Sequence, residues 1–165
     1  MTRSRTITWE DPLATAAKVR GMNGLEALHA AMAGEIPPPP ISQLLGTKLT
    51  KVEPGNVTME LPIGEYLYNP IGSVHGGVAA TLLDSVLGCA VQSTLPQGRL
   101  YTTLELKISY LRPITEATGT VTAIGRVLTS GRKAAFAEGQ ITDASGKLLA
   151  TASTTCAVWD MSSGL

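Results

Sequence analysis

The sequence predicts an α+β fold in which an antiparallel sheet wraps around one long helix, preceded by a helical arm. Beyond residue 101, long strand-like segments follow one another through short turns, which is the pattern of hairpin-linked antiparallel strands. One long helical segment interrupts the strand-like part of the chain, and it is apolar on nearly every side. Such a helix is typically buried, so we expect it to lie on the concave face of the sheet.

The first 40 residues predict a helical arm followed by a linker. Residues 11–34 have a helical pattern, with Asp11 as the expected N-cap and Pro12 as the first helical residue. Gly21 and Gly24 weaken the middle of this pattern, so two short helices are the alternative. The prolines at 37–40 then end the helix and form a stiff, extended stretch. We favour a spacer for this stretch over a polyproline ligand for a partner domain.

The chain is mostly strand-like from residue 41 onward. The expected strands cover residues 47–53, 56–62, 102–111, 118–128, 133–142 and 147–158. Pro54-Gly55 joins the first two as a hairpin turn. The segment 102–111 alternates most strongly, and its apolar face carries Leu104, Leu106, Ile108 and Tyr110.

The long helix is expected over residues 76–95, because Pro96 ends it. Its small and polar residues recur at spacings of three and four and therefore share one stripe. The stripe consists of Thr81, Asp84 or Ser85, Gly88 and Gln92. A carboxylate on an otherwise apolar helix lies in a functional cavity, on a solvated stripe or at a subunit seam. Asp84 is therefore the first candidate for chemistry.

Composition limits the class of protein. A chain of 165 residues with 44% hydrophobic residues predicts one core domain, placed at residues 41–160 between the arm and linker (1–40) and a tail (161–165). The 13 basic and 13 acidic side chains balance and aromatic residues are scarce, so we expect no nucleic-acid partner. No apolar run is long enough to span a membrane and no secretory segment is recognisable, so we expect a cytoplasmic protein. Cys89 and Cys156 are expected to be reduced structural thiols.

The residues at the start of the long helix form a second group of candidates. The first amides of a helix lack intrahelical acceptors and carry the positive end of its dipole, and glycine lets a ligand approach them. Gly76 and Gly77 therefore predict an oxyanion site, or simply a turn that needs two glycines. His75 either orients the loop or contacts a carbonyl group. Asn69 either positions water or a carbonyl or is an ordinary turn residue.

These residues together resemble the hotdog-fold acyl-CoA thioesterases, and most closely the phenylacetate-degradation (PaaI-like) branch. The matching positions are Asn69, Gly72, His75-Gly76-Gly77, Asp84 and Gly88, followed by Ser109-Tyr110-Leu111-Arg112-Pro113. The resemblance covers roughly residues 44–158. It implies a sheet wrapped around one helix, a homodimer or dimer of dimers (a homotetramer) with a continuous sheet, and active sites at the dimer seam.

The resemblance also implies roles for the site residues in the hydrolysis of an acyl-CoA. Asp84 of one subunit is the general base or the nucleophile, and it faces the other subunit's loop. On that loop, Gly76 N–H stabilises the oxyanion with help from His75, while Asn69 holds the attacking water or the carbonyl. Thr103 occupies the place of a hydroxyl residue on the strand after the helix, with strand packing as an equal alternative.

The phosphates of Coenzyme A require cations and amides. The expected CoA-binding segment is the basic turn Ser130-Gly131-Arg132-Lys133, with Gly77 as a further substrate contact and Arg112 and Arg126 as secondary candidates. The sequence has no metal-ligand spacing, P-loop or dinucleotide glycine pattern, so we expect no metal and no cofactor, CoA being part of the substrate.

Two other functions stay open. A hotdog hydratase or dehydratase uses a differently arranged His–Asp pair, and the position of Asp84, nine residues after His75, disfavours it. A non-catalytic acyl-CoA-binding protein is expected to lack the carboxylate. The helix residues expected to line the acyl pocket, Val78, Leu82, Val86 and Leu87, are aliphatic and do not choose between aryl and medium alkyl groups.

Overall fold

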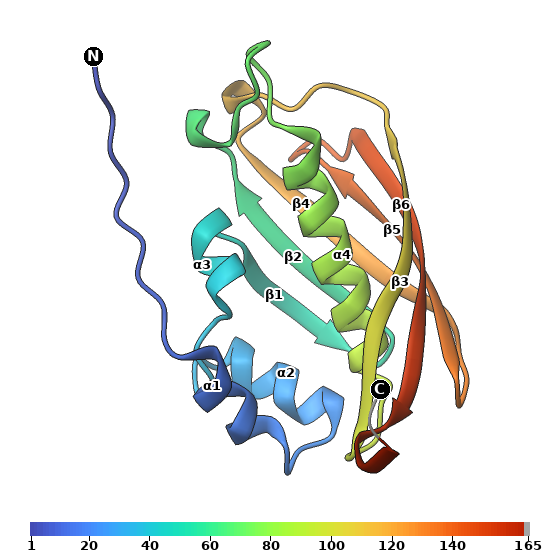
Figure 1. Ribbon diagram of the computed structural model, residues 1–165. Helices are drawn as coiled ribbons and strands as arrows, with labels where there is room; N and C mark the ends of the chain where they lie inside the picture. The colour runs from blue at the N-terminus through green and yellow to red at the C-terminus, as the bar shows by residue number, and fades with distance from the viewer. Residues whose placement is uncertain (164–165) are drawn as a thin grey trace.

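A computed structural model describes residues 1–163 and contains one six-stranded antiparallel sheet that curves around a central helix (Figure 1). The strands are β1 (Lys48–Glu53), β2 (Asn56–Pro62), β3 (Arg99–Tyr110), β4 (Thr120–Ser130), β5 (Ala134–Thr142) and β6 (Leu148–Asp160). Their order in the sheet is β1-β2-β4-β5-β6-β3. The predicted α+β architecture is confirmed, and every predicted strand is present with ends shifted by at most a few residues.

The central helix α4 (Gly76–Gln92) lies on the concave face of the sheet, as predicted. It ends three residues earlier than expected, because Ser93 and Thr94 bond the last carbonyls of the helix. The Ser93 hydroxyl donates to Ala90 O at 2.7 Å and accepts from Gly55 N at 2.7 Å, which ties the helix end to the β1–β2 turn. The helix end is therefore held by side chains and not by Pro96 alone.

A pair of glycines lets the sheet approach α4 closely. Gly125 on β4 is paired with Gly139 on β5, and both face the helix. A Cβ atom at Gly125 would lie 2.7 Å from Val86 O, and one at Gly139 would lie 3.0 Å from a Leu87 methyl carbon. Leu87 and Val86 are fully buried at this contact. The helix backbone thus rests directly on two residues without side chains.

The predicted alternation along β3 is wrong at Leu104. A β-bulge between Thr103 and Glu105 places Leu104 outside the regular pairing with β6, and Leu104 is 66% exposed. A bulge adds one residue and reverses which later residues face the core. The inward positions are therefore Tyr101 and Thr103 before the bulge and Leu106 and Ile108 after it, while Tyr110 is exposed.

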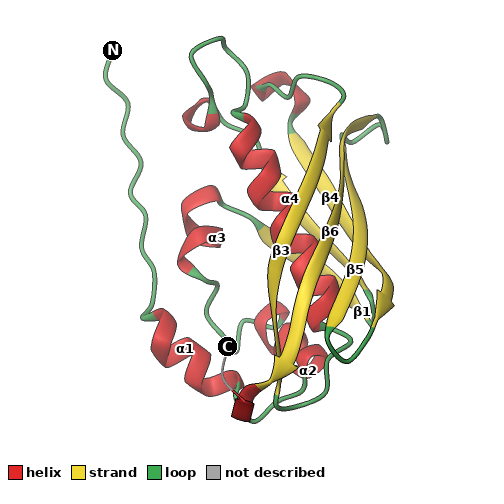
Figure 2. Ribbon diagram, turned by 45° about the vertical axis from the view of Figure 1, so that its right-hand side comes forward, coloured by secondary structure: helices red, strands yellow, loops and turns green. Residues whose placement is uncertain are grey.

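The N-terminal arm contains three helices (Figure 2): α1 (Pro12–Val19), α2 (Gly24–Met32) and α3 (Pro40–Leu45). The single helix predicted over residues 11–34 is divided at Gly21, as the two-helix alternative states. Asp11 caps α1, and Asn23 and Glu26 form a capping box at α2. The stretch of prolines is shorter than expected, because Pro40 is already the first residue of α3.

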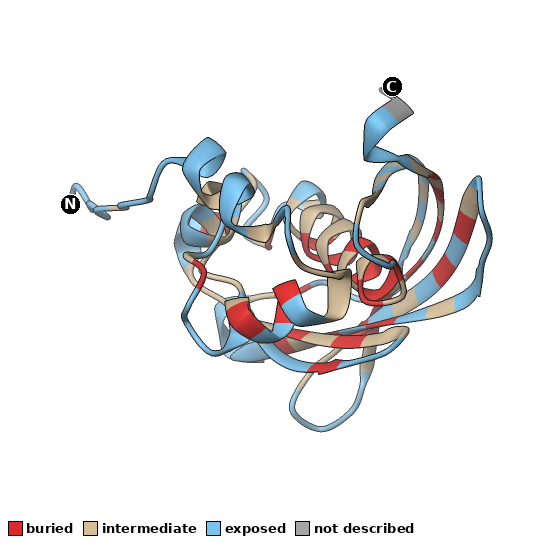
Figure 3. Ribbon diagram, turned by 90° about the horizontal axis from the view of Figure 1, so that it is seen from below, coloured by how far each residue is buried: buried red, intermediate tan, exposed pale blue. Residues whose placement is uncertain are grey.

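The first two helices, α1 and α2, differ in how they contact the core (Figure 3). α2 buries Ala27, Leu28 and Ala30, and Gly24 N donates to Leu95 O at 3.0 Å beyond the end of α4. α1 buries no residue, and Leu13 of its predicted apolar stripe is 78% exposed. The arm is thus joined to the core through α2.

Three short 3-10 helices complete the described chain: η1 (Glu65–Leu67), η2 (Glu116–Thr118) and η3 (Met161–Ser163). Within the expected tail, η3 covers residues 161–163, and residues 164–165 lie outside the described residues. None of the helices in residues 1–163 is long and apolar enough to cross a membrane.

Candidate active site

Asp84 lies in the middle of α4 and faces β3. Its Oδ1 accepts a hydrogen bond from the Thr103 hydroxyl at 2.8 Å, and both residues are partly buried. A bond to a charged carboxylate is stronger than one between neutral groups, and it fixes the rotamer of the acid. The structure therefore brings these two predicted site residues together, although their catalytic roles stay predictions.

Two ionisable groups near Asp84, the Cys89 thiol and the Tyr101 phenol, have raised pKa values. Burial, followed by the charge of Asp84, raises the pKa of the Cys89 thiol to about 12. Burial also raises the pKa of the Tyr101 phenol well above its usual range, with Cys89, Cys156 and Asp84 adding to the shift. A protonated thiol is a poor nucleophile. The expectation that Cys89 is a structural thiol thus agrees with its environment.

Gly88 sits one turn beyond Asp84 on the predicted polar stripe and packs against Tyr101. A Cβ atom at Gly88 would lie 2.6 Å from the Tyr101 hydroxyl oxygen. Tyr101 fills this side of the site because it is two residues before Thr103 on β3, and residues two apart share a face of a strand. Tyr101 was not among the predicted site residues, since the strand was expected to begin at residue 102.

His75 is the N-cap of α4. Its ring Nδ1 accepts a hydrogen bond from Gly77 N at 2.9 Å, and its backbone N–H donates to Leu67 O at 2.8 Å. With Nδ1 acting as an acceptor, the proton of the neutral ring lies on Nε2, which is then a hydrogen-bond donor. Of its two expected roles, the structure gives His75 that of orienting the loop, while leaving Nε2–H as a donor for a ligand.

The bond to His75 separates the two glycines at the start of α4. The Gly77 N–H is occupied, so the expectation that both amides receive an oxyanion is corrected to Gly76 alone. Among residues 1–163, no acceptor bonds the Gly76 N–H. The Tyr110 hydroxyl donates to Gly76 O at 3.1 Å, and a Cβ atom at Gly76 would lie 3.2 Å from the Tyr110 ring. Tyr110 was not expected to be part of the site.

Asn69 closes the loop that leads to His75. Its Oδ1 accepts from Ile71 N at 3.1 Å and Ser73 N at 3.3 Å, and its Nδ2 donates to the Ser73 hydroxyl at 3.2 Å. These bonds form an Asx turn. The structure therefore gives Asn69 the turn role, and its contact with water or a carbonyl stays a prediction.

The two groups of site residues are separated within one chain. Gly76 and Asp84 are eight residues apart on a straight helix, which corresponds to about 12 Å along its axis. A carboxylate this far from an oxyanion donor cannot act on the carbonyl that the donor holds. One chain therefore carries two half-sites: a first-turn half-site of His75, Gly76 and Tyr110, and a carboxylate half-site of Asp84 and Thr103.

The predicted CoA-binding turn lies at the opposite end of α4 from Gly76 (Figure 1). Ser130 Oγ accepts from the Thr94 hydroxyl at 3.1 Å, just past the end of α4, and Gly131 N donates to Ala134 O at 2.8 Å. Arg132 and Lys133 are exposed. Within one chain, this turn is thus distant from the first-turn half-site.

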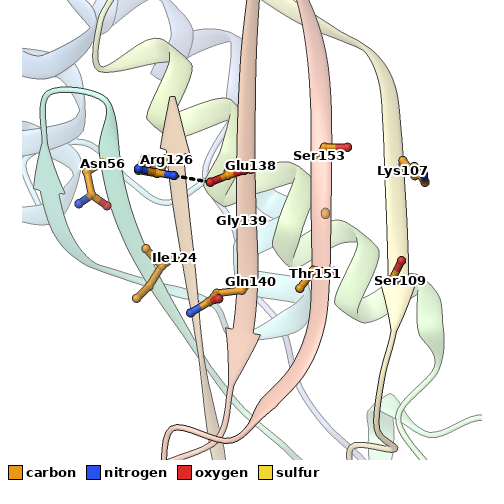
Figure 4. A pocket seen from close by; sticks show the side chains of 11 residues that line it. Asn56, Lys107, Ser109, Ile124, Arg126, Glu138, Gly139, Gln140, Thr151 and Ser153 are labelled. Carbon is orange, nitrogen blue, oxygen red and sulfur yellow. Dashed lines mark hydrogen bonds and ion pairs between the residues drawn. The ribbon is translucent and has the colours of Figure 1, made fainter. Parts of the chain in front are cut away.

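The two secondary cationic candidates lie in different places. Arg112 is exposed beside the first-turn half-site and donates to Leu148 O at 2.5 Å. Arg126 is on the face of the sheet turned away from α4, where it pairs with Glu138 in a polar hollow of about 640 Å³ (Figure 4). Arg126 therefore does not belong to the site, because strand alternation directs it outward.

Comparison with known proteins identifies the family. A model of the thioesterase superfamily matches residues 71–150. Human acyl-coenzyme A thioesterase 13 is 32% identical over 103 residues, which cover 62% of this chain and 72% of that protein. The chain belongs to the thioesterase superfamily. The matched residues include His75, Gly76, Asp84 and Thr103, whereas the arm lies outside them.

Solved structures place this thioesterase-superfamily chain in the PaaI-like branch. A thioesterase related to phenylacetic acid degradation from Ralstonia eutropha JMP134 is 31% identical, with a TM-score of 0.72 over 79% of this chain and 98% of that one. The Escherichia coli PaaI protein is 21% identical and shares the fold, with a TM-score of 0.71 over 81% and 92%. The resemblance to hotdog-fold thioesterases is confirmed.

Proposed function

We propose that the protein hydrolyses the thioester of an acyl- or aryl-CoA to a free carboxylic acid and CoA. The observation that carries the proposal is Asp84, a carboxylate on a helix that is otherwise apolar, held by the Thr103 hydroxyl at 2.8 Å. Membership of the thioesterase superfamily supports the same chemistry. The reaction needs water and no cofactor.

In the proposed reaction, the thioester carbonyl oxygen accepts hydrogen bonds from Gly76 N–H and His75 Nε2–H. Asp84 either removes a proton from the attacking water, or attacks the carbonyl itself to form an anhydride that water then hydrolyses to the free acid and the Asp84 carboxylate. In both cases negative charge develops on the carbonyl oxygen, where the helix N-terminus stabilises it. Collapse of the tetrahedral intermediate releases CoA as the thiolate.

The proposed active unit is a homodimer in which each site uses both half-sites, one from each copy. The outer edge of β3 has no partner strand among residues 1–163, and β3 is 12 residues long. Unpaired edges of this length readily pair with another chain. Along β3, Thr103 contacts Asp84 and Tyr110 contacts Gly76.

Antiparallel pairing of two β3 strands about residues 106–107 would place Thr103 of one copy opposite Tyr110 of the other. This pairing would bring each Asp84 to the Gly76 N–H of the second copy. It would also bring the basic turn at residues 130–133 toward the same site, since Arg99 at the start of β3 donates to Arg132 O. The dimer thus explains how distant segments serve one reaction. Whether two such dimers form a tetramer is a further prediction.

The test combines thiol release with complementation between inactive variants. Wild-type protein is expected to release CoA from at least one member of a panel of aryl- and alkyl-CoAs. Asp84→Asn is expected to lose most activity because the proposed base is absent, and Asn69→Ala because the amide predicted to hold the attacking water or the carbonyl is absent. A mixture of the two variants refolded together should regain about a quarter of the activity. This is because half of the dimers are mixed and each contains one intact site.

Two results would reject the proposal in separate ways. If wild-type protein releases no CoA from any thioester, the hydrolase function is wrong. If the variants lose activity but the refolded mixture regains none, the shared site is wrong. Trapping an acyl group on Asp84 with hydroxylamine distinguishes a nucleophilic carboxylate from a general base.

A further inference from the structure

The first turn of α4 separates two cavities that differ in size, and both are lined mostly by apolar side chains with one arginine each. One, of about 310 Å³, lies on the Gly76 side and includes Tyr110 and Arg112. The other, of about 510 Å³, lies on the Gly77 side. Its lining includes Ile7, Leu44, Tyr66, His75 and Val78. A thioester held at Gly76 would thus have the smaller cavity, with Arg112, on one side and the larger cavity, with Arg5, on the other.

The outer wall of the larger cavity comes from the extended N-terminal segment, which runs past α3 (Figures 1 and 2). Among residues 1–14, Ile7 is the one residue that is half-buried, and the others are exposed. Ile7 and Arg5 both line the cavity. This segment precedes residues 71–150, so the wall is an addition to the part matched by the family model.

Contacts of Arg3 and Arg5 with α3 and η1 hold the N-terminal segment in place beside the cavity. Arg5 Nη1 donates to Leu44 O at 2.6 Å, and the guanidinium lies 4.0 Å from the centroid of the Tyr66 ring. Arg3 forms an ion pair with Glu65. The cation–π contact and the charge-assisted bond to the carbonyl both favour this position of Arg5. Several anchors within five residues fix the position of Ile7.

We propose that this cavity receives the acyl group and that Ile7, held in place by Arg5, determines the length of acyl chain accepted. The inference rests on the proposed function, because it places the carbonyl at Gly76. The cavity is within the usual range of ligand pockets, and its lining suits an uncharged alkyl or aryl group. The CoA portion leaves on the opposite side, toward Arg112.

The test fills the cavity from the N-terminal segment. With Ile7→Trp, kcat/KM for dodecanoyl-CoA is expected to fall at least about tenfold, while kcat/KM for butanoyl-CoA changes less than about twofold, since a pocket discriminates by the atoms it can hold. Thr8→Trp adds the same bulk at an exposed neighbour and should change neither value. Arg5→Ala releases the segment and should raise KM for the long substrate more than for the short one.

A second measurement separates this inference from the proposed hydrolysis. Affinities of non-hydrolysable S-dodecyl- and S-butyl-CoA are measured by calorimetry for the same proteins. Weaker binding of the long thioether alone by Ile7→Trp supports the inference even if no thioester is hydrolysed. Equal losses for both lengths, no loss for either, or no binding of either thioether by wild type would overturn it.

Discussion

The first-turn half-site and the carboxylate half-site differ in the kind of group that each presents to a substrate. The first presents a backbone donor, the Gly76 N–H, which no acceptor within residues 1–163 bonds and which the cap between His75 and Gly77 N orients. The second is built from side chains, Asp84 and Thr103, on a helix and a strand that the core holds rigidly. A side-chain site is destroyed by one substitution, whereas a backbone donor survives most of them. Mutations in the two half-sites should therefore fail in different ways.

The largest effect is expected at the carboxylate half-site. Asp84→Asn removes the base but keeps the shape and an acceptor for Thr103, so kcat should fall at least about a hundredfold with the fold intact. Thiol release and circular dichroism measure the two properties. Asp11→Asn is a matched control, because asparagine caps α1 as well as aspartate does. A fully active Asp84→Asn would remove the chemical difference between the half-sites.

A smaller loss is expected when Asp84 keeps its charge but loses its partner. Thr103→Val removes the hydroxyl at nearly constant volume, and kcat should fall about tenfold, in line with the strength of a bond to a charged group. Thr103→Ser should restore most of kcat. If the residue serves strand packing only, Thr103→Ser lowers the melting temperature and Thr103→Val leaves kcat unchanged.

The first-turn half-site should show its effect in stability as much as in rate. His75→Ala removes the N-cap of α4, which costs about 1 kcal/mol in the free energy of unfolding, and kcat should fall by less than with Asp84→Asn because Gly76 N–H remains. His75→Asn keeps a capping oxygen and should recover the stability but not the Nε2 donor. Urea denaturation and steady-state kinetics on both variants separate capping from catalysis.

No loss of activity is expected when the protein is treated with a reagent that alkylates thiols, because Cys89 beside Asp84 should not react. The pKa of Cys89 is raised from 9.0 to about 12, so the thiol stays protonated at pH 8 and iodoacetamide should leave the enzyme active. Inactivation at pH 8 that Cys89→Ala prevents would contradict this.

The same shift makes stability depend on pH. The unfolded chain releases the Cys89 proton near pH 9 while the folded chain keeps it to about pH 12, so this contribution to stability decreases between these values. The decrease should be shallower in Cys89→Ala.

The sequence predicts the elements of the core better than their local geometry. The central helix and all six strands follow from periodicity and turn residues, because these depend on which face is buried. The bulge at Leu104 does not, since an extra residue in a strand leaves no mark in an alternating pattern until the pairing with β6 is known. Ile108 and Tyr110 therefore keep the predicted face, whereas Leu104 does not. Thr103 contacts Asp84 on α4 because it precedes the bulge.

For the site, the residue types were predictable and their contacts were not. The pattern around His75 and Asp84 indicated the chemistry, but which amide His75 would occupy depends on its rotamer at the helix start. Ile7 and Tyr66 carry no local signal, because their importance depends on an extended segment lying against α3. Their contribution becomes visible through the cavity they share.

The paired glycines of the sheet have a consequence for attempts to engineer this protein. Replacing glycine by alanine often stabilises a fold, since it restricts the unfolded chain. At Gly125 the added methyl would meet Val86 O at 2.7 Å, so the helix would have to rise from the sheet. Asp84 lies on that helix and Thr103 on that sheet. The usual route to a more thermostable variant would therefore alter the spacing of the two groups on which the proposed reaction depends.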